Sequence, residues 1–341
     1  MNGNKKLYLS ARFVTYLVDF LLYKGIDPAL YIDGYNLAET THELTSPLDI
    51  EYISDIFDNI SKSLSIPFLG YELADKFQFE NSSIMVKAML SSENVEGFFN
   101  TVVKYDKYVD SAIEVNFSCK SSEAVFDIEL FSPKNVNTTQ VTIYLISFII
   151  LTLKKVTRAE VPLTKIDVVS NVVAEAICNS FNTQEIEIKK HCARNRLFFD
   201  REFLSRKLSS SNLLLHEILC SALDQHFSPQ SENINIIDVV RREILMQNYQ
   251  SNANVCSVSL GLNMTERTLH RRLAEHDTTF KKLKQQTIIE RSMYYLANTN
   301  MSVNEISYEV GYSEVSAFSR AFKSYCNESP QDYRVTSKNI V

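Results

Sequence analysis

The sequence predicts two domains of different fold class: an α+β domain followed by an all-α domain at the C-terminal end. Three observations predict this division. The length of 341 residues suits two domains at roughly 150 residues each. The first part mixes helical periodicity with strand alternation, whereas the last part is helical throughout. The charge divides as well, because residues 1–230 carry a net −7 and residues 231–341 a net +1.

The composition fits a soluble globular protein, with 45% hydrophobic and 22% charged residues. Taken over the whole chain, the net charge of −6 argues against a protein that binds nucleic-acid phosphates. Because the acidic residues in excess lie almost wholly in the first part, this argument does not apply to the last part. The six cysteines form no C-x-x-C pair, which favours a reducing compartment.

Two amphipathic helices are expected first in the α+β domain. Ser10 begins one helix, which stops at Gly25 and has an apolar face of Phe13, Leu17, Phe20 and Leu21. Ser46-Pro47 opens the second, with proline at the first helical position. Its apolar face comprises Ile50, Ile53, Ile56, Phe57 and Ile60.

Strands follow where apolar residues alternate. Residues 112–118 and 124–131 read as two half-buried strands. Further elements are expected as a helix at 138–156, strands at 166–169 and 196–199, and a helix at 213–227.

The most apolar run, Val141–Leu153, has 13 residues, whereas a membrane span needs roughly 20. It is therefore expected to be a helix of a cytoplasmic protein with no membrane span, and no signal peptide is visible. Two uses remain open for it: the central core helix of the first domain, or part of a dimer face.

No enzyme signature is found, so no catalytic residue, metal site or cofactor is expected. The chain lacks a glycine-rich phosphate loop and zinc-type Cys/His spacing. His191-Cys192 is the closest approach to a ligand pair. The aromatic residues Phe98, Phe99, Tyr105, Tyr108, Phe126 and Phe131 indicate core, although a small-molecule pocket would use the same types.

A polar stretch from Ser228 to Asn233 that contains Pro229 marks the domain boundary. The expected organisation is an N-terminal domain at 1–210, a connecting helix and linker at 211–232, and a C-terminal domain at 233–341. Helices of the last domain are expected at about 234–249, 253–260, 265–275, 279–298, 302–310, 314–326 and 330–334.

An internal repeat organises the C-terminal domain. Residues 255–266 match residues 303–314 at an offset of 48, with apolar residues at equivalent helical positions. Asn263 and Gly311 tolerate positive φ at a helix end, and Thr265 and Ser313 can cap the next helix. With one extra residue, Leu269, Arg271 and Leu273 align with Phe318, Arg320 and Phe322. The pattern predicts two helix-turn-helix motifs, at 253–274 and 301–324.

This geometry would suit two adjacent DNA grooves. The second helix of such a motif enters the major groove, and successive groove faces recur about every 34 Å. The helix expected at 279–298 would be roughly 30 Å long at about 1.5 Å per residue. Seven basic residues against four acidic ones from Glu266 to Arg291 add a local charge of +3.

The C-terminal part resembles the AraC/XylS family of bacterial transcription regulators over about residues 234–336. The resemblance lies in Leu262–Leu273, Thr279-Phe280, Tyr295-Leu-Ala297, Val310–Lys323 and Ser329–Arg334. More loosely, Lys24–Pro28, Leu69–Leu73 and Leu90–Ser92 are similar to the arabinose-binding-like N-terminal effector domain of a subgroup of that family.

The resemblance implies a sequence-specific DNA-binding transcription regulator that is an effector- or partner-responsive activator. Its partners would be double-stranded DNA, RNA polymerase and a second copy of the chain, with an unidentified small-molecule effector. The alternative is an enzyme or ligand-binding module in the N-terminal part with an attached DNA-binding domain. A pocket of convergent polar residues with perturbed pKa would favour the enzyme, and an apolar closed pocket the sensor.

The expected DNA-contacting residues lie on the two second helices and at the start of the connecting helix, with Arg271 and Arg320 the strongest candidates for base contact. The set is Thr265, Arg267, Thr268, Arg271, Arg272, Lys281, Lys282, Ser313, Val315, Ser316, Arg320 and Lys323. Departures from the family pattern are Ile288 in place of Arg, Ser292 and Ser307 in place of Ala, and Asn327 in place of Gly.

Overall fold

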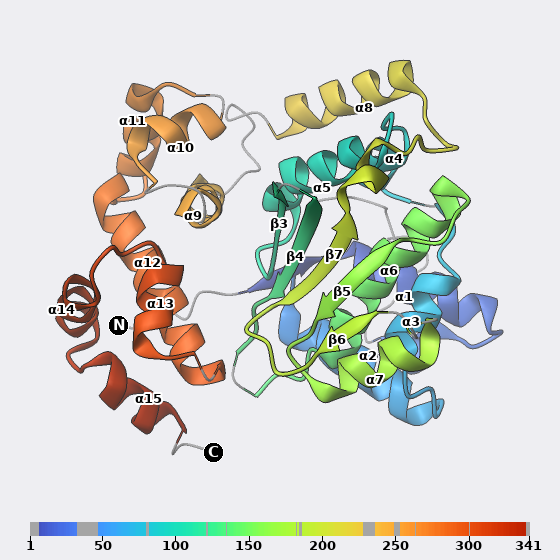
Figure 1. Ribbon diagram of the computed structural model, residues 1–341, viewed down its shortest axis with the longest axis horizontal. Helices are drawn as coiled ribbons and strands as arrows, with labels where there is room; N and C mark the ends of the chain where they lie inside the picture. The colour runs from blue at the N-terminus through green and yellow to red at the C-terminus, as the bar shows by residue number, and fades with distance from the viewer. Residues whose placement is uncertain are drawn as a thin grey trace. The chain divides into compact units, whose positions relative to one another are not determined.

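The computed structural model has two compact units, Met1–His226 and Phe227–Val341. It describes residues 7–32, 47–79, 82–120, 122–133, 135–181, 183, 186–227, 236–248, 253–262, 264–299 and 301–338. Unit 1 is α+β and unit 2 is helical, so the predicted fold class is confirmed (Figure 1). The polar stretch at 228–233 lies outside the described residues.

Unit 1 contains a five-stranded sheet with strand order β3-β4-β7-β5-β6. Its pairs are antiparallel except β5 with β6. The strands are β3 (Ile113–Lys120), β4 (Glu123–Leu130), β5 (Leu163–Asp167), β6 (Glu187–Lys189) and β7 (Asn195–Asp200). The alternating segments thus form the strands that their periodicity predicts.

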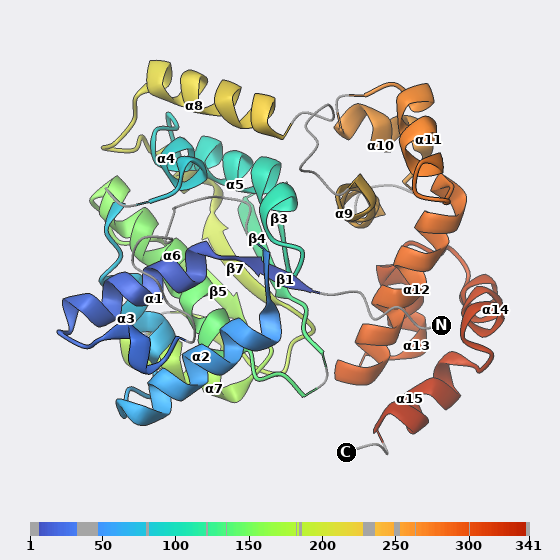
Figure 2. The same ribbon diagram turned by 180° about the vertical axis from the view of Figure 1, so that it is seen from behind.

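Helix α6 (Thr139–Thr157) is the central core helix of unit 1. It is long and apolar enough to pass for a membrane span, but 72% of its apolar window is buried inside the protein. In Figure 2, α1, α2 and α3 lie in front of α6 and the strands lie behind it. The burial supports the core-helix interpretation of Val141–Leu153.

The remaining helices of unit 1 cover this centre. They are α1 (Arg12–Tyr23), α2 (Ile50–Ser63), α3 (Leu69–Asp75), α4 (Ile84–Leu90), α5 (Val95–Val109), α7 (Asn171–Ser180) and α8 (Leu213–His226), with short 3₁₀ turns η1 (Pro28–Leu30) and η3 (Arg201–Ser205). Helix α1 ends just before Gly25, whose φ of +72° is the left-handed conformation that glycine favours.

The expectation that Pro47 opens α2 is wrong. Pro47 pairs with Ser10 in a two-stranded sheet of β1 (Tyr8–Ser10) and β2 (Pro47–Asp49). The helix begins at Ile50, because the Asp49 side chain accepts a hydrogen bond from the Glu51 amide and caps it. Proline suits an edge strand because no ladder hydrogen bond needs its missing amide proton.

The described residues of unit 2 form seven helices. They are α9 (Ile236–Asn248), α10 (Val255–Gly261), α11 (Glu266–Ala274), α12 (Phe280–Asn298), α13 (Val303–Glu309), α14 (Val315–Cys326) and α15 (Pro330–Lys338). Figure 2 shows α12 running from the α10–α11 pair to the α13–α14 pair. A buried cluster that includes Tyr295, Leu296, Ile306, Phe318 and Phe322 joins α12 to the second pair.

Candidate nucleic-acid interface

The two helix pairs repeat each other down to their turn hydrogen bonds. In the first turn the Met264 amide donates to the Ser259 carbonyl, and in the second the Tyr312 amide donates to the Ser307 carbonyl, each at 2.9 Å. Both pairs of residues are related by the offset of 48 that the sequence repeat has. The repeat is therefore a repeat of backbone structure.

The first helix of each pair also begins in the same way. Asn254 and Ser257 form a reciprocal capping box at α10, and Ser302 and Glu305 form one at α13. These caps are again 48 residues apart, and each satisfies amide groups that a helix start would otherwise leave unpaired. The sequence reasoning missed both caps, although a polar residue three positions before another polar residue would have indicated them.

The second helices begin differently, and Ser313 explains why. Thr265 caps α11 by accepting from the Thr268 amide at 3.2 Å, as expected. The expectation that Ser313 caps α14 is wrong, because the cap position is Glu314, without a side-chain hydrogen bond. Ser313 is the extra residue in the second turn, so the offset changes from 48 to 49 at this point.

The turn residues were expected to adopt positive φ. Gly311 does so, with φ of +91°, at the end of α13. Asn263 lies outside the described residues.

Each second helix has a buried apolar pair and an exposed arginine between the two. Leu269 and Leu273 on α11 and Phe318 and Phe322 on α14 are fully buried, while Arg271 and Arg320 are exposed. Residues four apart share one face of a helix, and a residue midway between them points elsewhere. The arginines are thus held on the outer face by a fixed core, as base-reading side chains must be.

Arg271 and Arg320 differ in their surroundings. Arg271 pairs with Glu275, one turn further along α11, at 2.6 Å between Nη1 and Oε1. Both side chains are more than half exposed, so this ion pair is weak, on the order of 0.3–0.5 kcal/mol. A guanine could replace it at small cost.

The other candidate side chains are also reachable from solvent. Thr265, Arg267, Lys281, Lys282, Ser313, Ser316 and Lys323 are exposed, and Thr268, Arg272 and Val315 are partly buried. Two of them already have polar neighbours: the Thr268 hydroxyl lies 2.9 Å from that of Thr265, and the Ser316 hydroxyl donates to Glu314 at 3.4 Å.

Two basic residues that contribute to the +3 charge are buried or partly buried. Arg291 is buried, and its Nε donates to the Tyr295 hydroxyl at 2.9 Å. Lys284 donates to the carbonyl of Ala253, and burial lowers its pKa. Arg291 thus bonds within α12 and Lys284 joins α12 to Ala253, so the basic surface is smaller than the count of charges indicates.

The departures from the family pattern have structural roles. Ile288 is in the buried cluster, so no phosphate contact arises there. Ser292 and Ser307 are fully buried; Ser292 donates to the Ile288 carbonyl at 2.7 Å, whereas the Ser307 hydroxyl has no partner within the described residues. Asn327 ends α14 with φ of +62°, the conformation that glycine and asparagine tolerate.

Unit 2 contains two helix-turn-helix motifs, and in each an exposed arginine lies on a helix whose apolar face is buried. This arrangement defines the class of unit 2: a DNA-binding domain. Residues 259–336 match the family model described as a helix-turn-helix domain. Unit 2 therefore contains an AraC-type helix-turn-helix domain, which is what the resemblance implied.

Several curated relatives are transcription regulators. An uncharacterised HTH-type transcriptional regulator of Mycobacterium tuberculosis is 30% identical over 141 residues, 41% of each chain. The Msm operon regulatory protein of Streptococcus mutans is 30% identical over 37% of this chain and 44% of that protein. The transcriptional activator PerA of Escherichia coli is 24% identical over 53% of this chain and 57% of that protein. The chain thus spans about half the length of these relatives.

Among solved structures, the transcriptional regulator CdpR from Pseudomonas aeruginosa aligns with 94% of this chain and 97% of its own at 16% identity. The TM-score of 0.44 is below the level that establishes a common fold.

Proposed function

We propose that the chain is a sequence-specific DNA-binding transcription regulator that reads two adjacent major grooves through α11 and α14. The observation that carries this proposal is the duplicated turn with an exposed arginine on each second helix. Since α12 has 19 residues, it is about 28 Å long at 1.5 Å per residue. This length is close to the roughly 34 Å between successive groove faces, and a modest DNA bend would improve the fit.

The regulator is proposed to act as an activator in the cytoplasm that responds to an effector or a partner, with RNA polymerase and a second copy of the chain as further partners. The activator role is supported by the name of the relative PerA. A ligand could switch such a protein only by binding one arrangement more tightly than the other.

The interior of unit 1 favours a sensor over an enzyme. A cavity there is lined mainly by apolar side chains, with Arg12, Tyr16, Asp106 and Tyr144 among them. Burial raises the pKa of the Tyr16 and Tyr144 phenols, so both stay protonated. Burial opposes the charge of Arg12, but Asp110 and other neighbours outweigh it and raise its pKa. None of these shifts creates a base or a nucleophile.

The proposal is tested by selecting DNA from a random pool with the full chain and measuring mobility shifts on the enriched sequences. We expect two short conserved blocks whose centres lie about ten base pairs apart, one helical turn. Enrichment of no motif, or of a single block, would contradict the two-groove proposal.

A further inference from the structure

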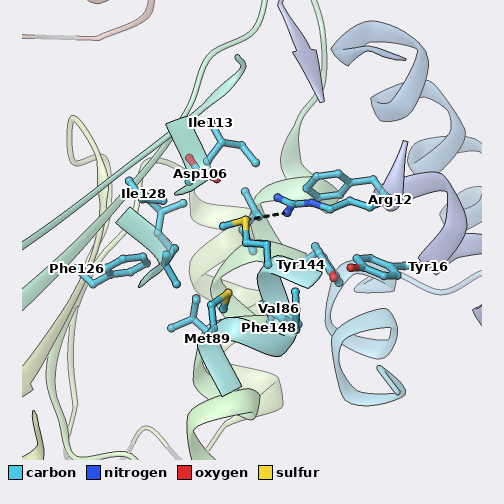
Figure 3. A pocket seen from close by; sticks show the side chains of 16 residues that line it. Arg12, Tyr16, Val86, Met89, Asp106, Ile113, Phe126, Ile128, Tyr144 and Phe148 are labelled. Atoms are coloured by element: carbon cyan, nitrogen blue, oxygen red, sulfur yellow. Dashed lines mark hydrogen bonds between the residues drawn. The ribbon is translucent and has the colours of Figure 1, made fainter. Parts of the chain in front are cut away.

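The cavity of unit 1 lies between five elements. Its volume is about 60 Å³, room for on the order of four water molecules. The walls come from α1, α4, α5, α6 and one face of the β3–β4 hairpin (Figure 3). Protein interiors contain few voids larger than a single water, so a void of this size is unusual in so well packed a core.

One end of the cavity is polar. Arg12 and Tyr16 are one turn apart on α1 and reach into the cavity from the same side, as Figure 3 shows, while Phe126 and Ile128 close the opposite side. Asp106 on α5 also lines the cavity. Arg12 and Tyr16 thus form a polar wall on α1, whereas Figure 3 shows Asp106 on the other side, beside Ile113 and Ile128.

Two donors on that wall are poorly used. Ser83 lies near the Tyr16 hydroxyl, yet within the described residues this hydroxyl, on a side chain only 7% exposed, makes no hydrogen bond of normal geometry. Arg12 pairs with Asp110, and its Nη1 donates to the Met85 sulfur at 3.6 Å (Figure 3). A thioether is a weak acceptor, so an oxygen would be a better partner for that N–H.

The charges around the cavity favour an uncharged guest. Arg12 is balanced by Asp110, whose side chain is fully buried, and Asp106 adds a second carboxylate nearby. An anionic guest would meet the carboxylate of Asp106, and a cationic guest would meet Arg12. Burying either charge without a dedicated partner is costly, whereas a neutral oxygen can accept from the unused donors.

The apolar walls can adapt to a small organic body. Met85 and Met89 line the cavity from α4, and methionine side chains repack easily because they are unbranched. On the far side the rings are fixed by their neighbours; Tyr144, for example, stacks on Phe148 with 5.7 Å between ring centroids. A guest would therefore be accommodated by movement of the methionines.

We infer that this cavity is a binding site for a compact, neutral organic molecule with an apolar body and one hydrogen-bonding oxygen, which would accept from Arg12 and Tyr16. The idea that the cavity is the sensing site of a regulator rests on the proposed function. The idea that the cavity binds such a molecule does not, and the experiment below therefore contains no DNA.

The test uses the full chain with carbon-13 in the methionine methyl groups, titrated with cyclopentanone and followed by NMR. Among the methionines whose side chains the structure describes, Met85 and Met89 line the cavity, and Met264 and Met293 in unit 2 serve as internal references. We expect saturable shifts of the Met85 and Met89 signals. If the Met85 and Met89 signals shift only when the Met264 and Met293 signals shift as well, the inference of a specific site is wrong.

Matched probes and variants separate a site from a mere void. Cyclopentane lacks the oxygen and cyclopentanecarboxylate is charged, so both should bind more weakly than cyclopentanone. Tyr16→Phe should weaken cyclopentanone binding about 2- to 10-fold, as loss of one hydrogen bond does, and leave cyclopentane binding unchanged. Tyr71→Phe, on α3 outside the cavity, is the control variant and should bind like the parent.

Equal affinity for cyclopentanone and cyclopentane, in the parent and in Tyr16→Phe alike, would show that the polar wall recognises nothing and would refute the inference. Because the Tyr16 hydroxyl makes no hydrogen bond of normal geometry, Tyr16→Phe should lower the thermal stability of the chain little. If it does unfold, Met89→Phe provides the second test, since a bulkier side chain should fill the cavity and abolish cyclopentanone binding.

Discussion

The arginines of α11 and α14 are the residues on which DNA specificity should depend. Replacing Arg320 with Ala should weaken specific binding by about 1–3 kcal/mol and relax the preference at one base position, because a guanidinium binds guanine through two hydrogen bonds. Mobility-shift titration against a set of single-base variants of the selected site measures both effects. Lys62→Ala, an exposed change on α2, is the control, and unchanged discrimination by Arg320→Ala would remove Arg320 from the reading surface.

Arg271 should contribute less than Arg320, because Glu275 holds it by an ion pair that DNA must replace. Replacing Glu275 with Gln should therefore strengthen binding by about 0.3–0.5 kcal/mol through Arg271, plus a gain from removing a negative charge near phosphates. The charge effect is isolated by repeating the change in an Arg271→Ala background. If Glu275→Gln strengthens DNA binding equally in both backgrounds, the ion pair of Glu275 with Arg271 does not weaken any contact of Arg271 with DNA.

The two buried serines allow a direct comparison of a partnered and an unpartnered hydroxyl. Ser307→Ala should raise the free energy of unfolding by up to about 1 kcal/mol, because an unpaired buried hydroxyl is removed. Ser292→Ala should be neutral or slightly destabilising, because its hydrogen bond to Ile288 is lost with it. Urea unfolding followed by circular dichroism compares the two variants. The reverse order of stabilities would show that Ser307 has a partner in solution.

At the scale of the element, the start of α13 should respond to acid and the equivalent start of α10 should not. Hydrogen bonds from Ser302 lower the pKa of Glu305 below its ordinary value of 4.5. A depressed carboxyl pKa means that the cap stabilises the helix above the unfolded pKa and that this stabilisation is lost as pH falls through the folded pKa. The cap of α10 uses Asn254 and Ser257, which do not titrate.

Amide hydrogen exchange at pH values above and below 4.5 tests this difference. Protection at the start of α13 should fall relative to α10 as the pH drops. Glu305→Gln keeps an acceptor for the cap but removes the titration, so its protection should be independent of pH over the same range. A parallel loss of protection in both helices would contradict the role of Glu305.

At the scale of the whole molecule, periodicity predicts the helices of unit 2 and some elements of unit 1, but it gave no prediction for α3, α4, α5 and α7. Both β3 and β4 and every helix of unit 2 lie where the apolar spacing indicates, since burial of one face requires that spacing. The start of α2 was missed because the Asp49 cap and the pairing of Pro47 with Ser10 outweigh the preference of proline for a first helical turn. Such a pairing joins segments far apart in the sequence, which local patterns do not contain.

The candidate DNA interface was likewise predicted in outline. The exposed arginines followed from the positions of their buried neighbours, but the role of Ser313 required the turn hydrogen bonds. The burial of Arg291 and the partial burial of Lys284 could not be read from charge counting, because a count does not distinguish a solvated cation from one that bonds to a neighbouring protein group. The cavity of unit 1 brings together α1, α4, α5, α6 and the β3–β4 hairpin, and no single stretch of sequence indicates it.

The spacing of the two half-sites tests the central claim most directly, because α12 fixes the separation of the two reading helices. The selected DNA site is altered by inserting five base pairs between its two conserved blocks, which places them on opposite faces of the duplex, and binding is measured by mobility shift. We expect specific binding to fall to the level of the Arg320→Ala variant. Full retention of specific binding by the lengthened site would contradict simultaneous reading of two adjacent grooves by one chain.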